Sequence, residues 1–377
     1  MTRLYLDHNA TSPLRPSAQF VLQQLHGKPL NASSVHAEGR FAMAQLEKAR
    51  LDFAQYLSAP HQGVIFTGGG SEACNQAIKA WRAEVRPFQR ILVSAIEHEA
   101  VLKSANDSGL DVGVLKTGTD GTIDLNDLAQ QLDGPPALVC VMLANNETGV
   151  IQPITEVCRL TKENDGLVFC DATQAVGKME VSFIGLGVDM LAVSAHKFGG
   201  PVGVGALIIC PSLAIAPLIA GGGQELGRRS GTQNVAAIIA MVAALEEAIT
   251  ELPLFAQLSA VRDALEVGLK EHCRAIRIMG EGAPRLANTS CFAVPFSKAE
   301  TLLMGLDLAG ISISSGSACS SGKVARSHVL ESMGVDASVS QAALRVSLGR
   351  ENTVQDMNVF LNAWKKEMGR QIASAAE

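Results

Sequence analysis

The chain has 377 residues, of which 47% are hydrophobic, and its 31 basic and 37 acidic side chains give a formal net charge of −6. This slightly acidic balance, with no block of Lys and Arg, argues against nucleic acid as a partner. The first residues reach Asp7 before an apolar region forms, and no apolar run approaches the roughly 20 residues of a membrane helix, so neither a secretory signal nor a membrane span is expected.

Short apolar segments alternate along the chain with longer amphipathic stretches, and polar residues follow most of the apolar segments. Strands are predicted at 64–67, 91–94, 137–143, 167–170, 190–194 and 205–210. Apolar strands separated by helices are typical of a mainly parallel sheet that is buried on both faces. The predicted fold class is therefore α/β, with a mainly parallel central sheet flanked by helices and a smaller α+β domain.

The domain boundary is expected just before Pro253, where a helical pattern over 255–272 begins a second set of elements. This boundary gives a large domain over 16–250 and a small C-terminal domain over 251–377. The N-terminal arm, residues 1–15, is expected to fold back onto the small domain and join the two. A chain of this length is sufficient for two such cores.

Asp171 and Lys197 each follow a predicted strand, so the fold can bring an acid and an amine to one edge of the sheet. A Lys there can form a Schiff base with an aldehyde, and an Asp can keep a pyridine nitrogen protonated. Pyridoxal phosphate requires both groups from its protein. Taken alone, such a pair more often forms a salt bridge beside a solvated His196, so the neighbouring residues decide between the two interpretations.

Several other signals lie at the ends of predicted strands or in glycine-rich loops. They are 68–72, His98, 145–149, 221–225 and 228–232. Each is weak alone, because strand–helix turns are often rich in glycine, a lone His is more often structural, and Asn-rich segments favour turns. The first of these joins a strand to a helix, whose N-terminus attracts a phosphate. Together they favour a cofactor that carries a phosphate.

Cys319 lies in a segment of small polar residues, 314–322, whereas the other seven cysteines have apolar or helical surroundings. A buried thiol behaves as a small hydrophobic group, but a thiol in a Ser/Gly loop stays accessible. Alone, this feature fits redox sensing as well as catalysis. No Cys-x-x-Cys pair is present, which argues against structural zinc, and free thiols predict a reducing cytoplasm.

The set of motifs resembles that of the NifS/IscS-type cysteine desulfurases, which are pyridoxal-phosphate enzymes of the class-V aminotransferase superfamily. The resemblance runs from Tyr5 to Arg350, nearly the whole chain. It rests on Leu6-Asp7-His8-Asn9-Ala10-Thr11, Glu97-His98, Asn145-Asn146-Glu147-Thr148-Gly149, Asp171-Ala172-Thr173-Gln174, His196-Lys197, Arg229-Ser230-Gly231-Thr232 and the Cys319 segment, which is similar to the first of the family's two groups. It implies a fold-type I homodimer with active sites at the subunit interface, pyridoxal 5'-phosphate as cofactor and L-cysteine as substrate.

The resemblance also implies roles for the residues that contact the cofactor. Lys197 would be the Schiff-base lysine and Asp171 the partner of the pyridine nitrogen. His98 would stack on the ring and relay protons, and Gln174 would contact the ring hydroxyl. The phosphate would be held by Ser71, the backbone near Glu72, Ser194, His196 and, from the other subunit, Thr232.

On the substrate side, Asn146 would contact both cofactor and substrate, and with Arg345 it would bind the substrate carboxylate. A planar guanidinium suits that bidentate contact. Cys319 would be the nucleophile that takes the sulfur, leaves alanine and passes the persulfide to an acceptor or iron–sulfur scaffold protein. No resident metal is implied, only a cluster that Cys319 shares transiently with an acceptor.

Three departures from the family pattern leave the catalytic groups in place. They are Ala195 before His196-Lys197, Ala73-Cys74 after the phosphate turn, and 31–34 without the usual proline. The alternatives to a desulfurase are a selenocysteine lyase, another class-V aminotransferase, and a non-catalytic sulfur carrier. The chain stops soon after 365–366, where some relatives continue into a tail that docks a scaffold, so the acceptor stays open.

Overall fold

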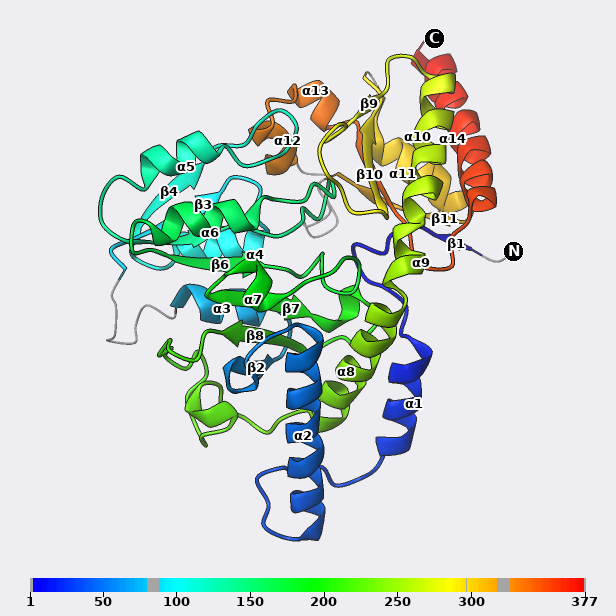
Figure 1. The fold of residues 1–377 in the computed structure, drawn as a ribbon. Helices are drawn as coiled ribbons and strands as arrows, with labels where there is room; N and C mark the ends of the chain where they lie inside the picture. The colour runs from blue at the N-terminus through cyan, green and yellow to red at the C-terminus, as the bar shows by residue number, and fades with distance from the viewer. Residues whose placement is uncertain (1–2, 80–87, 296, 317–325, 376–377) are drawn as a thin grey trace.

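The computed structural model describes residues 3–79, 88–295, 297–316 and 326–375, with side chains up to Gln371 (Figure 1). A seven-stranded sheet forms its centre, in the order β2-β8-β7-β6-β5-β3-β4. The strands are β2 (Val64–Thr67), β3 (Arg90–Ser94), β4 (Asp111–Leu115), β5 (Ala137–Cys140), β6 (Leu167–Asp171), β7 (Met190–Ser194) and β8 (Gly205–Ile209). All neighbours pair in parallel except β8, which is antiparallel to β2 and to β7.

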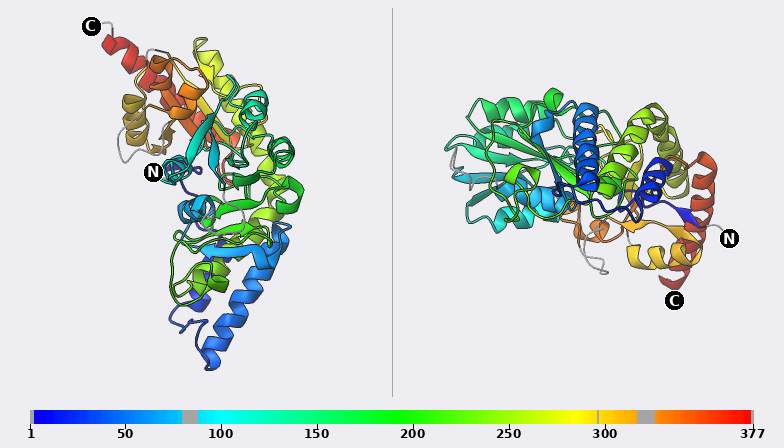
Figure 2. Two further views of the ribbon diagram at one scale, coloured as in Figure 1. Left: turned by 90° about the vertical axis from the view of Figure 1, so that its left-hand side faces the viewer. Right: turned by 90° about the horizontal axis from the view of Figure 1, so that it is seen from below.

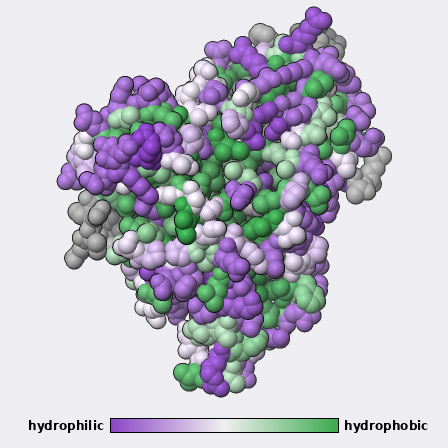
Figure 3. Space-filling view, viewed as in Figure 1, coloured by the Kyte–Doolittle hydropathy of each residue, from purple (hydrophilic) through white to green (hydrophobic). Residues whose placement is uncertain are grey.

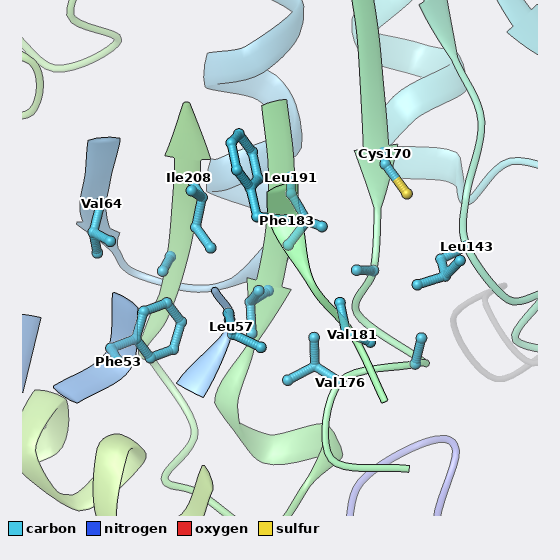
Figure 4. Packing of buried hydrophobic residues seen from close by; sticks show 14 of the residues in the cluster. Phe53, Leu57, Val64, Leu143, Cys170, Val176, Val181, Phe183, Leu191 and Ile208 are labelled. Atoms are coloured by element: carbon cyan, nitrogen blue, oxygen red, sulfur yellow. The ribbon is translucent and has the colours of Figure 1, made fainter. Parts of the chain in front are cut away.

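Helices cover both faces of this sheet, because successive strand residues point to opposite sides. On β7, Leu191 packs into the cluster that includes α2 (Ala37–Tyr56), α5 (Leu125–Gln131), α6 (Ile154–Lys162) and α8 (Val235–Thr250). The next residue, Ala192, packs into the opposite cluster with α3 (Gly70–Lys79) and α4 (Glu99–Asn106). Figure 4 shows the first cluster, with Phe53 of α2 and Leu57, which follows the helix, facing the side chains of the strands. The result is three layers, α/β/α.

A second group of elements packs around its own core of Phe292, Phe360 and Trp364. It holds a four-stranded sheet of β9 (Arg277–Ile278), β10 (Thr289–Ala293), β12 (Ser314–Ser315) and β13 (Ala343–Ser347). Its helices are α9 (Leu252–Ala256), α10 (Leu258–His272), α11 (Ala299–Leu308) and α14 (Val354–Ala375). The short helices α12 (His328–Ser332) and α13 (Ala337–Ser340) pack in a further cluster with Ile96 and Met142. This group and α2 lie at opposite ends of an elongated molecule (Figure 2). The division into two domains and the boundary near Pro253 stay predictions.

The N-terminal arm lies between the two groups of elements. Its strand β1 (Leu4–Tyr5) pairs in parallel with β11 (Ile311–Ser312), and the arm then runs past the central sheet to α1 (Pro16–Leu25). Asp7 forms an isolated parallel bridge with Ser347. The arm therefore contacts the last strand of the C-terminal sheet before it reaches the helices of the large sheet.

Two predicted elements differ from the structure by more than one residue at an end. The predicted strand 137–143 ends at Cys140, and the predicted helix 255–272 is divided into α9 and α10, with the break at Gln257. Pro253 lies in the first turn of α9, where its missing N–H costs no helical hydrogen bond. In the described part of the chain, no helix combines the length and apolar character that crossing a membrane requires.

The substitution Leu265→Ala tests the second core. Leu265 is fully buried on α10, and removing its side chain leaves a cavity that α14 cannot fill, so the free energy of unfolding should fall by about 2–5 kcal/mol. Urea denaturation measures the change. Val267→Ala on the same helix is the control, because Val267 is 55% exposed and its truncation should cost little. Equal losses in the two variants would contradict this packing.

Candidate active site

A cavity of about 520 Å³ opens at the carboxyl ends of the parallel strands, within the size range of small-molecule sites. Five strands end at the cavity: β2, β3, β5, β6 and β7. The polar residues that follow them in the sequence meet at this one edge of the sheet. Most of the residues predicted from the sequence line it: Ser71, Glu72, His98, Asn146, Asp171, Gln174, Ser194, His196, Lys197 and Arg345. Thr232 is exposed outside the cavity, and Cys319 falls in 317–325, outside the described residues.

Asp171 ends β6 and presents its carboxylate to the cavity while its residue is only 6% exposed. Its Oδ1 accepts a hydrogen bond from the Thr173 N–H at 2.9 Å, and the Cys74 thiol lies 3.8 Å from Oδ2. Burial raises the pKa of the Cys74 thiol well above its usual value, so Cys74 stays neutral beside the acid. An anionic carboxylate in so dry a place suits a protonated ring nitrogen as its partner.

Lys197 lies in a short 3₁₀ turn directly after β7. Its Nζ donates to the backbone carbonyls of Asn9 at 2.7 Å and Ala10 at 2.9 Å, both in the N-terminal arm. The amine is therefore held at the wall of the cavity by carbonyl oxygens, which have no proton to exchange with it. An amine held in this way can form a covalent bond with an aldehyde in the cavity.

His98 caps α4, and this contact determines its tautomer. Its Nδ1 accepts a hydrogen bond from the Ala100 N–H at 3.0 Å, so the neutral ring carries its proton on Nε2. Burial lowers the pKa of His98, and the charge of Lys197 lowers it further against the opposite effect of Asp171. A neutral, half-buried imidazole at the cavity wall can stack on a flat ring and exchange a proton through Nε2.

The turn between β2 and α3 supplies the features that bind a phosphate. The first N–H groups of α3 have no partner within the helix, and the helix dipole favours an anion there. A Cβ atom on Gly70 would lie 3.1 Å from Thr173 Oγ1 and from Ser194, so glycine allows the turn to approach β7. The buried Thr173 Oγ1 has no partner among the described residues and can donate to an anion in the cavity. These residues fit the phosphate of pyridoxal phosphate.

The side chain of Glu72 has a different function from the backbone around it. Its carboxylate accepts from the Gly68 N–H at 2.7 Å and pairs with Arg229, with 2.8 Å between Oε1 and Nε. It therefore ties the phosphate turn to the segment that carries Thr232. His196, also predicted to hold the phosphate, contacts Thr11 Oγ1 at 3.2 Å, and burial lowers its pKa to about 4.

Arg345 of β13 closes the other side of the cavity and is 1% exposed. Its Nη2 lies 2.7 Å from Asp7 Oδ1, and its Nη1 donates to the Asn146 carbonyl at 3.0 Å. Its Nε is buried with no hydrogen-bond partner among the described residues. A buried donor without a partner is costly, and a carboxylate in the cavity would satisfy it.

Sequence reasoning missed three groups at this site. Asn9 lines the cavity and bonds to both domains, Lys178 is buried behind Gln174, and Glu147 is buried beside Ser327, whose Oγ is 2.5 Å from its Oε2. Asn9 and Glu147 lie within recognised motifs, but their partners lie between 137 and 338 positions away in the sequence. Only the spacing of Lys178, four residues after Gln174, was visible locally.

The comparison with known families agrees with this geometry. The aminotransferase class-V family matches residues 4–360. The chain belongs to that family. It is 38% identical over 369 residues to the cysteine desulfurase IscS of Dictyoglomus turgidum, which covers 96% of this chain and 94% of the relative. It is 40% identical over 369 residues to an IscS-like cysteine desulfurase of Mycobacterium tuberculosis, covering 95% and 94%.

Solved structures extend the likeness to the fold. The structure of a NifS-like protein from Rickettsia africae matches 97% of this chain and 99% of its own, with a TM-score of 0.89 and 32% identity. The predicted fold class, the NifS/IscS-type resemblance, the cysteine desulfurase activity and the dependence on pyridoxal phosphate are thereby confirmed. A selenocysteine lyase, another aminotransferase and a non-catalytic carrier are not favoured.

Glu147→Gln tests the burial of that carboxyl. Burial raises the pKa of Glu147 to about 7, against the opposite effects of Ser327 and Arg345. In the unfolded chain the Glu147 carboxyl ionises near pH 4.5, whereas in the folded protein it stays protonated up to about pH 7. The free energy of unfolding therefore falls as the pH rises from 4.5 to 7. Glu147→Gln has no carboxyl to ionise, so its free energy of unfolding relative to that of the wild type should increase by roughly 2–3 kcal/mol between pH 5 and pH 8.

The measurement is the free energy of unfolding of both proteins at the two pH values. Glu163→Gln is the control, because that side chain is 58% exposed. A pH dependence that Glu147→Gln leaves unchanged would show that the buried carboxyl does not titrate in this range.

Proposed function

We propose that this cysteine desulfurase works as a homodimer that moves the sulfur of L-cysteine onto Cys319 and passes it to a protein acceptor for iron–sulfur cluster assembly. The observation that carries this proposal is the convergence of Lys197, Asp171 and Arg345 on one cavity from two strands of the central sheet and one of the C-terminal sheet. An amine, an acid and a guanidinium in one place serve a cofactor aldehyde, its ring nitrogen and a substrate carboxylate.

The residues of the cavity would hold pyridoxal phosphate at four points. Lys197 would bind its aldehyde carbon, Asp171 its ring nitrogen, His98 its flat face, and the turn at 68–72 its phosphate, with Ser194 and His196 beside it. When bound, this group draws electrons from the substrate carbon and so stabilises the negative charge that develops there. Gln174, on the same wall, would contact the ring oxygen.

The substrate is oriented by its carboxylate. Arg345 has two of its guanidinium nitrogens held by Asp7 and the Asn146 carbonyl, so its Nε points to a fixed place. Because the guanidinium is held before substrate arrives, little side-chain entropy is lost on binding. Asn146 lies beside it at the same wall.

Proton transfer and sulfur attack fall to three side chains. Lys197 Nζ would take the proton from the substrate α-carbon, and His98 Nε2 would relay protons between the substrate and the thiol of Cys319. The thiolate of Cys319 attacks the substrate sulfur, forming an S–S bond as the C–S bond breaks, and the carbon part leaves as alanine. The thiolate is the reactive form, so a base within reach is required near neutral pH.

Exposed apolar side chains support the homodimer. Phe20 of α1 is 61% exposed, Val35 before α2 is 88% exposed, and Leu226 is 73% exposed with a φ of 58°. The lower tip of the molecule, where α2 begins, shows apolar atoms at its surface (Figure 3). A second copy on this side would cover them and bring Thr232 to the other subunit's phosphate site.

The cellular location and the acceptor are proposed from the cysteines and from the names of the relatives. The cysteines of the described residues are unpaired, as is typical of proteins in a reducing cytoplasm. The relatives carry the name IscS or IscS-like, which supports an acceptor in iron–sulfur assembly. The division into domains 16–250 and 251–377 is supported by the two separate hydrophobic cores.

Cys319→Ala tests the sulfur acceptor. Peptide mass spectrometry after incubation with cysteine should place one added sulfur on the peptide containing Cys319. The variant should carry none and should release alanine at least about 100-fold more slowly, because the attacking group is missing. Cys273→Ala, which removes a partly accessible thiol elsewhere in the chain, is the control and should match the wild type. Added sulfur on a different cysteine in the wild type would contradict the assignment of Cys319 as the sulfur acceptor.

Arg345→Lys tests the carboxylate contact. A lysine supplies one charge without the planar fork, so the KM for cysteine should rise about 10–100-fold with a smaller effect on kcat. Steady-state alanine release measures both constants. Arg285→Lys is the matched control, because the side chain of Arg285 is 7% exposed and pairs with Glu266 away from the cavity. If only kcat changes in Arg345→Lys, the guanidinium acts in the chemical step and not in binding.

A further inference from the structure

Lys178 is a buried lysine to which the mechanism above gives no role. The residue is 5% exposed, and its Nζ donates to Gln174 Oε1 and to Asn9 Oδ1, each at 2.8 Å. Both partners are neutral amides. Burying an ammonium group without a carboxylate is costly, so its contacts with these amides must contribute to the folded site.

The two neighbours of Gln174 impose one orientation on its amide. The amide oxygen faces Lys178 Nζ, which can donate to it in either protonation state, and the contact on the other side of the amide excludes the reverse orientation. The backbone carbonyl of Asn9 can only accept, so the amide nitrogen, 2.9 Å away, must face Asn9. Since Gln174 also lines the cavity, its second N–H is the polar group left to face the cavity. This orientation presents a donor there, not an acceptor.

Lys178 also orients the side chain of Asn9. Asn9 Oδ1 accepts from Lys178, so the Nδ2 group faces the other way and donates to the Asn146 carbonyl at 3.2 Å. The same carbonyl accepts from Arg345 Nη1. The amine of Lys178 is thus linked to the cofactor wall through Gln174 and to the substrate wall through Asn9.

We propose that Lys178 is a positioning residue that fixes Gln174 as a hydrogen-bond donor toward the cofactor's ring oxygen and holds Asn9 so that its carbonyl accepts from Lys197. The inference rests on the proposed contact between Gln174 and the cofactor. An anionic oxygen requires a donor, and an amide free to rotate would present its oxygen part of the time.

The charges around Lys178 have one dominant sign. Burial lowers the pKa of Lys178 well below its usual value, and the charges of Lys197 and Arg345 lower it further. The other titratable groups near Lys178 are His8 and His196, whose pKa values Lys178 helps to lower, and Asp7, which pairs with Arg345. Lys178 also lines an adjoining cavity of about 320 Å³, whose charged residues are Arg3, Arg15, Arg350, Glu351 and Asp356. Burial and these two charges therefore disfavour the protonated form of Lys178.

The test is Lys178→Met in the full-length protein loaded with pyridoxal phosphate. Methionine has a similar length but no donor and no charge. The midpoint of the pH titration of the bound cofactor's visible absorbance should rise by about one pH unit, because the fixed donor to the ring oxygen is lost. The dissociation constant for pyridoxal phosphate should rise roughly tenfold, since Gln174 loses its fixed orientation.

Two further variants separate positioning from general destabilisation. Adding Gln174→Ala to Lys178→Met should weaken cofactor binding by less than Gln174→Ala does in the wild type. The reason is that both substitutions remove the same contact, the one between Gln174 and the cofactor. Leu265→Ala should lower stability without moving the absorbance midpoint. Full additivity of the two site variants would show that Lys178 does not act through Gln174 and would overturn the proposal.

The outcomes also distinguish this inference from the proposed function. If the wild type binds pyridoxal phosphate and Lys178→Met has the same midpoint and dissociation constant, only the role of Lys178 fails. If the wild type itself shows no cofactor absorbance, the proposed function fails first. Should Lys178→Met not fold, Lys178→Gln replaces the amine with a donor of shorter reach. Its midpoint should rise by roughly half a unit, and an unchanged one overturns the proposal.

Discussion

The backbone carbonyl of Asn9 accepts hydrogen bonds from Lys197 at 2.7 Å and from Gln174 at 2.9 Å, and the rest of the site is arranged around this contact. Its other groups bond to Ser347, Asn146, Thr289, Lys178 and Asn288. One residue of the arm thereby joins the large sheet to the C-terminal sheet. If Asn9 moved, the Lys197 amine and the Arg345 guanidinium would no longer be held in fixed positions relative to each other. Catalysis depends on such positioning at the level of an ångström.

The electrostatics of the site follow from burial more than from pairing. Burial lowers the pKa of His196 to about 4 and that of Lys178 well below its usual value, and it raises the pKa of Glu147 to about 7. Arg345 forms an ion pair with Asp7. These side chains lie around the places where a charged cofactor and substrate would bind. A dry site strengthens each of these contacts.

The sequence predicts the central strands because they are buried on both faces. The strands predicted at 64–67 and 190–194 have the bounds of β2 and β7, since a continuous apolar run ends where the backbone leaves the sheet. The edge strand β4 escapes prediction, because Asp111 is exposed and Gly113 interrupts the apolar pattern. Site residues after strand ends could be found in the same way. Contacts such as that of Lys178 could not, because they form only when the arm is in place.

The arm has a consequence for how the protein is made. Leu4 pairs with Ile311, Asp7 with Arg345, and Asn9 with Ser347, so residues of the arm bind partners that are synthesised up to 338 positions later. The central sheet can form during synthesis, but the hydrogen bonds that hold Lys197 must wait for the C-terminal sheet. Such distant pairs form slowly because the closing loop is long. A nascent chain would therefore fold its cofactor platform well before it completed the substrate wall.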